Sequence, residues 1–184
     1  PPLLLHPDER LERLAAAGVV VTVVQHYDET VRRITYDAFV GMIEERTSLA
    51  GLLMTPDAAF GFERRGTPEA LTALGRDHGF DVVVIPPFEL GDRAVRSSEI
   101  RAAIAAGDLT TAAGLLGRAV TLRGTPSDGE LRFDWPQALP PDGDYAGELD
   151  GRPVRVTVRD GRIRLPDGMA GGSAGGPVSV ALHG

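Results

Sequence analysis

Three residue types are missing from this sequence, and each absence excludes a kind of chemistry. Cysteine is absent, which excludes a thiolate nucleophile, a disulfide and a cysteine-ligated zinc site. Lysine is absent, so there is no phosphate-loop lysine and no Schiff base, and all 19 residues of the lysine–arginine class are arginines. Asparagine is absent, which excludes an N-glycosylation site. We attribute the joint loss of lysine and asparagine to codon bias, not to selection of arginine for binding.

The charge balance excludes further classes of protein. The 184 residues carry a formal net charge of −7 at pH 7, whereas proteins that bind nucleic acid non-specifically usually present a basic surface. No apolar run approaches the ~20 residues of a membrane span, and no signal peptide is visible. We therefore expect a cytoplasmic protein without nucleic-acid or membrane partners. Because the sequence begins with Pro1 instead of methionine, we also expect upstream residues to be missing from it.

Helical and strand patterns alternate over the first 119 residues. Capping residues indicate helix starts at Pro7, Thr35, Thr67, Ser97 or Ser98, and Asp108. Glycines that follow apolar stripes indicate helix ends at Gly18, Gly79, Gly107 and Gly117. Strands are predicted between the helices at Val19–Val24, Leu49–Met54 and Asp81–Ile85. Because these strands are apolar throughout, we predict an α/β domain at residues 1–119, with a parallel sheet and helices on both faces.

The pattern then changes to short strands separated by turns such as Asp150-Gly151 and Asp160-Gly161. The predicted strands are Val120–Arg123, Glu130–Phe133, Tyr145–Leu149, Val154–Val158, Arg162–Leu165 and Val178–Leu182. The glycine-rich segment Met169–Gly176 is predicted to be a flexible loop. We predict a small antiparallel β-barrel or sandwich at residues 120–184.

The first candidate site is an anion site at the start of a helix. Ser97 and Ser98 place two hydroxyls at the helix N-terminus, where backbone N–H groups and the helix dipole attract a phosphate. Arg101, three residues after Ser98, has a guanidinium that can bind two phosphate oxygens at once. The alternative is an ordinary serine N-cap with a solvated arginine.

The second candidate site follows a predicted strand. Asp57, Phe60 and Gly61 combine a carboxylate, an aromatic ring and a flexible backbone, which could stack on and hydrogen-bond a planar ligand. The alternative is a surface turn whose phenylalanines pack into the core. Arg64 and Arg65 follow, either as a solvated turn or as a mobile cationic loop over phosphates.

A third segment, Gln25-His26-Tyr27-Asp28, follows the first predicted strand. His26 could act as a general base or a metal ligand. The chain has only 4 histidines, and no second one lies at ligand spacing. We therefore favour a surface histidine at this position.

The order of these features is similar to that of one family. In chain order they are the polar segment with Asp28, the helix start Thr35-Tyr36-Asp37-Ala38-Phe39, Asp57-x-x-Phe60-Gly61, Gly66-Thr67, Ser97-Ser98-x-Ile100-Arg101 and Leu115-Leu116-Gly117-Arg118. Over about residues 1–124 the chain resembles the adenylyltransferase module of the bacterial bifunctional riboflavin kinase/FMN adenylyltransferase (FAD synthetase) family. The resemblance implies a Rossmann-like nucleotidyltransferase fold that transfers AMP from ATP to FMN, giving FAD and pyrophosphate.

The resemblance also implies roles for individual residues. Arg101 would be catalytic, stabilising the charge that develops on the reacting phosphates. The residues implied in ATP binding are Ser97, Ser98, Arg101, Arg64 and Arg65. The residues implied in binding the flavin are Asp57, Phe60, Gly61 and Asp28. Mg²⁺ would bridge phosphate oxygens, and no residue of this sequence is assigned to a metal.

The sequence departs from the family pattern in ways that leave alternatives open. The family's Gly-x-Phe-Asp-x-x-His-x-Gly-His segment is not in these 184 residues, and Ala58 stands where a phenylalanine is usual. Acceptors other than FMN, and a non-catalytic protein that binds nucleotide or flavin, therefore stay open. Leu139–Ala146 resembles the riboflavin kinase barrel, but its Pro-Thr-Ala-Asn motif is missing. We expect residues 120–184 to lack kinase activity and to serve a structural role, possible homo-oligomer formation included.

Overall fold

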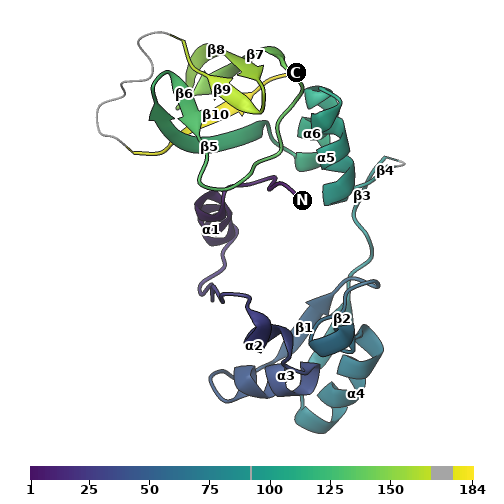
Figure 1. Cartoon of the computed structure of the whole chain (residues 1–184). Coiled ribbons are helices and arrows are strands. Elements are labelled where there is room, and N and C mark those ends of the chain that lie inside the picture. The colour runs from purple at the N-terminus through teal and green to yellow at the C-terminus, as the bar shows by residue number, and fades with distance from the viewer. Residues whose placement is uncertain (92, 167–175) are drawn as a thin grey trace. The chain divides into compact units, whose positions relative to one another are not determined.

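The computed structural model describes residues 1–91, 93–166 and 176–184. The chain divides into two compact units (Figure 1). Unit 1 consists of Pro1–Thr22 and Leu90–Gly184, and unit 2 consists of Val23–Glu89. Each unit is described by itself below. None of the described helices is long and apolar enough to cross a membrane.

Unit 2 is a small α/β unit. Its elements are α2 (Glu29–Arg32), α3 (Tyr36–Glu44), β1 (Gly51–Met54), the 3-10 turn η1 (Phe62–Arg64), α4 (Pro68–His78) and β2 (Asp81–Val84). Strands β1 and β2 pair in parallel, from Gly51 opposite Asp81 to Met54 opposite Val84. A parallel pair needs a crossover connection, which α4 provides.

Helices α3 and α4 pack on one face of the β1–β2 sheet. Val40 of α3 and Leu71 of α4 are fully buried and form a core with Met54 and Phe80. On the opposite face, Leu53 and Val83 lie opposite each other and are 73% and 51% exposed. The prediction of a parallel sheet is confirmed, but helices on both of its faces are not found in the described part of unit 2.

The predicted strand at Val19–Val24 is wrong. These residues have no regular secondary structure and are exposed, Val20 to 95%. A strand needs a neighbour for its backbone N–H and C=O groups, and β1 and β2 pair only with each other within the described chain. The β-branched composition therefore predicts a preference for extended backbone, but not the partner strand that burial requires.

Most helix limits follow the predicted capping residues. Asp108 accepts a hydrogen bond from the Thr111 N–H at 2.9 Å and begins α6 (Leu109–Leu116). Gly79 and Gly117 end α4 and α6 in the left-handed conformation, at φ 85° and 67°. Helix α5 (Ser97–Ala105) differs, because its N-cap is Arg96 and no side chain caps it. The prediction that Ser97 or Ser98 is the N-cap is therefore wrong, by one residue for Ser97 and by two for Ser98.

Unit 1 contains a closed antiparallel barrel of six strands in the order β10-β5-β6-β9-β8-β7. The strands are β5 (Val120–Ser127), β6 (Glu130–Arg132), β7 (Gly143–Leu149), β8 (Arg152–Arg159), β9 (Arg162–Arg164) and β10 (Val178–Leu182). Each of the six predicted strands is confirmed, and the choice between barrel and sandwich is settled as a barrel. The predicted loop at residues 169–176 lies, except for Gly176, outside the described residues.

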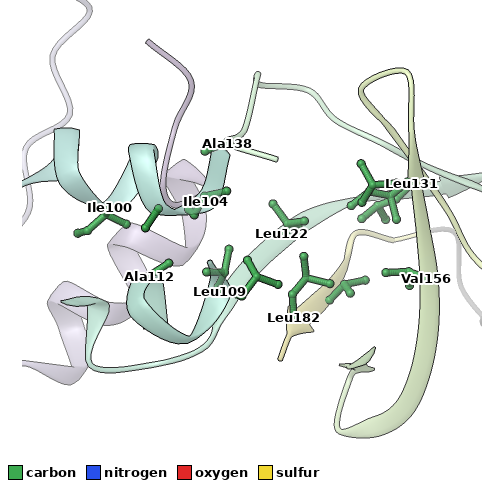
Figure 2. Close-up of a cluster of buried hydrophobic side chains, with 14 of the residues drawn as sticks. Ile100, Ile104, Leu109, Ala112, Leu122, Leu131, Ala138, Val156 and Leu182 are labelled. Carbon is green, nitrogen blue, oxygen red and sulfur yellow. The ribbon is translucent and has the colours of Figure 1, made fainter. Parts of the chain in front are cut away.

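Helices α5 and α6 share a hydrophobic core with the barrel. Figure 2 shows Ile100 and Ile104 of α5 in one cluster with Leu122, Val156 and Leu182 of the barrel. This packing places both helices in unit 1, so the compact units divide the chain at other positions than residue 119. Two short strands, β3 (Glu89–Leu90) and β4 (Arg93–Ala94), precede α5 and pair with each other.

The N-terminal helix α1 (Pro7–Ala16) is held to the barrel by a buried carboxylate. Glu9 is 7% exposed, accepts hydrogen bonds from Arg13, and lies 2.9 and 3.0 Å from the Thr121 hydroxyl on β5. Arg118 donates to the same hydroxyl at 3.0 Å. Burial, followed by the nearby Arg13 cation, lowers the pKa of Arg118. Because a buried carboxylate needs such partners, this network ties Pro1–Thr22 to unit 1.

Candidate functional site

Unit 2 contains an apolar cavity of about 240 Å³. The lining residues are Gln25, Tyr27, Val31, Arg32, Ile34, Phe39, Phe60 and Gly61. The rings of Phe39 and Phe60 meet edge to face, with centroids 5.5 Å apart and planes at 66°. Aromatic walls of this kind bind flat, weakly polar groups. The cavity is therefore suited to the ring system of a ligand.

A closed loop positions Phe60 in this cavity. The Phe60 N–H donates to the Gly66 carbonyl at 3.3 Å, and the Gly66 N–H donates back to the Phe60 carbonyl at 2.9 Å. The Phe62 N–H donates to the Ile34 carbonyl at 2.7 Å, which ties the loop to the chain before α3. The two bonds between Phe60 and Gly66 close the loop. The bond from Phe62 holds the loop against Ile34, which also lines the cavity.

Gly61 is required by its surroundings. Its φ is 75°, in the left-handed region that side chains rarely adopt. A Cβ at this position would lie 2.5 Å from the Tyr36 backbone nitrogen at the start of α3. Only glycine at this position lets the loop lie so close to the N-terminus of α3. This close approach brings Phe60 and Phe39 to one cavity.

The predicted flavin residues divide into two groups. Phe60 and Gly61 line the cavity. Asp28 is exposed and caps α2, its Oδ1 accepting the Val31 N–H at 2.9 Å. The Asp57 Oδ1 lies 3.0 Å from the Thr55 hydroxyl. Both carboxylates thus make local hydrogen bonds, and neither is among the residues that line the cavity.

Arg64 and Arg65 lie in the loop that carries Phe60. Both are exposed, and Arg65 forms an ion pair with Glu63 at 2.8 Å. Arg64 donates to the Asp57 carbonyl at 3.4 Å. Glu63 and Arg64 have φ values of 54° and 55°, a strained conformation for residues other than glycine. The turn is therefore cationic and solvated, with backbone strain at its tip.

Ser97, Ser98 and Arg101 belong to unit 1, whereas the other predicted site residues belong to unit 2. Both serines are exposed in the first turn of α5. The Arg101 Nε donates to the Pro2 carbonyl at 2.7 Å, and a terminal nitrogen donates to the Ser97 carbonyl at 3.2 Å. Two carbonyls therefore hold the guanidinium beside the N-terminal turn of α5.

No group of three or more histidine and acidic side chains that could hold a metal ion occurs in the part of the chain that the structure describes. His26 is exposed. Mg²⁺ usually takes only one or two carboxylates of a protein and completes its coordination shell with water and substrate phosphates.

Sequence reasoning did not connect Arg32 and Phe39 with the cavity. Phe39 was singled out as part of the helix start at Thr35, and its partner Phe60 lies 21 positions later in the chain. The sequence did contain one sign of the cavity. The polar and aromatic segment Gln25–Asp28 directly follows an apolar run. That signal pointed to His26, while its neighbours Gln25 and Tyr27 line the cavity.

Comparisons with known proteins identify the family and several relatives of this chain. A family model described as FAD synthetase matches residues 1–99. The chain is 27% identical over 123 residues to the bifunctional riboflavin kinase/FMN adenylyltransferase of Escherichia coli (strain K12), covering 66% of this chain and 39% of that protein. It is 28% identical over 88 residues to the protein of that name from Buchnera aphidicola subsp. Acyrthosiphon pisum (strain APS), covering 48% and 28%.

One solved structure matches almost the whole chain. It is the crystal structure of a macrolide-efflux protein from Streptococcus pneumoniae, with a TM-score of 0.75 and 21% identity. The match covers 97% of this chain and 66% of that one. At this identity it shows the fold alone. The family match, in contrast, spans more than half of the residues, and the chain therefore belongs to the FAD synthetase family.

Proposed function

We propose that this chain contributes the acceptor site of an FMN adenylyltransferase, which transfers AMP from ATP to FMN and releases pyrophosphate. Family membership supports the reaction class. The chain spans 39% of the length of its Escherichia coli relative, so the activity of the whole protein is part of the proposal. The observation that carries the proposal is the aromatic cavity built from Phe39, Phe60 and Gly61.

In this proposal the flavin ring occupies the cavity of unit 2. Phe39 and Phe60 supply apolar contact area, and their edge-to-face arrangement leaves a ring surface for the ligand. The loop that carries Phe60 is fixed by three backbone hydrogen bonds, to Gly66 in both directions and to Ile34. A fixed wall contributes to catalysis because it reduces the entropy that must be lost when the reactants are aligned.

The phosphates of ATP are assigned to Ser97, Ser98 and Arg101, with Arg64 and Arg65 as further cations. The first turn of α5 offers backbone N–H groups. Arg101 has five N–H donors, and the Pro2 and Ser97 carbonyls accept two of them. These two bonds orient the guanidinium. Its other N–H donors are then available to a phosphate with little further loss of side-chain freedom.

The chemical step is a displacement at phosphorus. An oxygen of the FMN phosphate forms a bond to the α-phosphorus of ATP, and the bond from that phosphorus to the bridging oxygen of pyrophosphate breaks. The leaving pyrophosphate takes the electron pair. Arg101 stabilises the charge that builds on the phosphate oxygens, which is the main task of the protein in such transfers. When bound, Mg²⁺ would neutralise part of the charge on the phosphate oxygens of ATP.

Two further assignments belong to the proposal. Residues 1–119 form a Rossmann-like nucleotidyltransferase domain, of which the parallel β1–β2 pair is a part. Residues 120–184 lack riboflavin kinase activity and have a structural or subunit-contact role. The barrel interior is filled by side chains, since Val156, Val158 and Ile163 are at most 1% exposed, so a subunit contact would use the outer surface of the barrel.

The test is an assay of the purified full-length protein with ATP, Mg²⁺ and FMN, in which FAD and pyrophosphate are measured by chromatography. Equal amounts of both products support the proposal. Pyrophosphate formed only with another phosphorylated acceptor would keep the reaction and reject the flavin. Flavin binding without any product would identify a binding protein. Riboflavin with ATP is expected to yield no FMN.

A further inference from the structure

Three of the residues that line the cavity in unit 2 have polar side chains. Gln25, Tyr27 and Arg32 supply its polar groups, and all three come from the short segment that leads into and through α2. The other walls are aromatic or aliphatic. Arg32 is the one charged side chain among the described residues that line this cavity. A ligand whose ring lies between the aromatic walls therefore has one lining cation, the Arg32 guanidinium, available to it.

Arg32 has a replaceable partner. Its NH1 lies 3.3 Å from Oε2 of Glu29, while the Arg33 Nε lies 2.9 Å from Oε1 of the same carboxylate. Exposed ion pairs of this kind contribute little to stability. Because Arg33 makes the shorter contact, Glu29 keeps a cation when Arg32 turns to a ligand. The other carboxylate of the segment, Asp28, is occupied with the N-terminus of α2.

We propose that Arg32 binds the phosphate of the acceptor and makes this site select a phosphate monoester of a planar molecule over its neutral parent. The inference rests on the proposed function, which places the acceptor ring in the cavity. The guanidinium is suited to this role because its planar fork binds two phosphate oxygens together. Gln25 and Tyr27 line the same cavity and supply uncharged hydrogen-bonding groups.

The test compares FMN with riboflavin, which carries the same ring without the phosphate. Binding is measured without ATP, by titration of flavin fluorescence, for the unaltered chain, Arg32→Gln and Arg33→Gln. The unaltered chain is expected to bind FMN more tightly than riboflavin. Arg32→Gln should weaken FMN binding by about tenfold and leave riboflavin binding unchanged, since one charge-assisted contact is lost. Arg33→Gln is the matched control, because it removes the neighbouring cation from the same carboxylate.

Each other outcome overturns the inference in a distinct way. If Arg32→Gln leaves the ratio of FMN to riboflavin affinity unchanged while both flavins bind, the role of Arg32 is wrong and the flavin site stands. An equal loss in Arg33→Gln would show a general charge effect and reject a specific contact. If the unaltered chain binds neither flavin, the proposed function fails and this inference fails with it. Retained riboflavin binding in Arg32→Gln also shows that the cavity is still folded.

Discussion

The two units differ in how completely their secondary structure is paired and covered. In unit 1 every barrel strand has a neighbour on both sides, and 17 buried hydrophobic residues of its described part form one cluster. In unit 2 two strands pair only with each other, and the corresponding buried cluster has 4 residues. A small core with an uncovered sheet face supplies less hydrophobic stabilisation. The cavity therefore lies in the unit that is expected to open more easily.

The largest expected effect is the unfolding of unit 1 by a charge in the barrel. Val156 is fully buried, so Val156→Asp places a carboxylate among aliphatic side chains without a partner. We expect loss of the cooperative thermal transition, followed by circular dichroism. Leu53→Asp is the control in unit 2, where the side chain is 73% exposed, and it should change stability by less than about 0.5 kcal/mol. Equal damage by both changes would contradict the comparison.

The next effect concerns the small core of unit 2. Leu71 is fully buried in a cluster of 4 residues, so Leu71→Ala should cost about 2–5 kcal/mol. Since the unit has few other contacts, this cost should appear as local opening. Hydrogen exchange should become faster in α3, α4, β1 and β2 and remain unchanged in the barrel. Faster exchange spread evenly over both units would contradict this view.

The next effect concerns the rate of catalysis and depends on Arg101. Arg101→Ala should lower the turnover of FMN adenylylation by about 10²-fold, because one contact to the charge of the transition state is lost. Glu99→Gln serves as the control, since Glu99 is exposed on the first turn of the same helix. The rate of FAD formation is the measurement. An unchanged rate in Arg101→Ala would show that the phosphates bind elsewhere.

The smallest effect is a pH dependence of unit 1. Hydrogen bonds from the Thr111 side chain, and then from its backbone, lower the pKa of Asp108 at the start of α6. The folded state therefore binds the proton less readily than the unfolded state. The stabilisation is present above the ordinary pKa of the carboxyl and is lost as the pH falls from about 5 towards 3.

Asp108→Asn isolates this contribution, since the amide oxygen still caps the helix but does not titrate. The Tm of the unaltered chain should fall relative to that of Asp108→Asn as the pH is lowered. Parallel Tm curves for the two proteins would refute the assignment.

The local limits of helices and strands were predictable because single residues determine them. Asp108, Gly79 and Gly117 act through their own backbone conformation or side chain, and all three occupy the predicted positions. The strand predicted at Val19–Val24 failed because pairing depends on a partner elsewhere in the fold. The same limit explains why a sheet covered on both faces was predicted, while the described part of unit 2 has one face bare.

The candidate site was predictable only in part, for a related reason. Phe60 and Gly61 lie in a recognisable loop, and both line the cavity. Arg32 and Phe39 join them through the close approach of the loop to Tyr36, which no local pattern encodes. The closure of the barrel is a similar case, since it depends on β10 pairing with both β5 and β7.

The central claim is that the cavity of unit 2 binds the flavin ring through Phe60. The direct measurement is an FMN titration of the chain carrying Phe60→Leu, with Phe62→Leu as the matched control two residues away. Phe60 lines the cavity, whereas Phe62 is an exposed residue outside its lining. We predict that Phe60→Leu weakens FMN binding by about tenfold, because a ring contact is lost while an apolar side chain remains, and that Phe62→Leu leaves it unchanged. Equal FMN affinities in both variants and the unaltered chain would contradict the account.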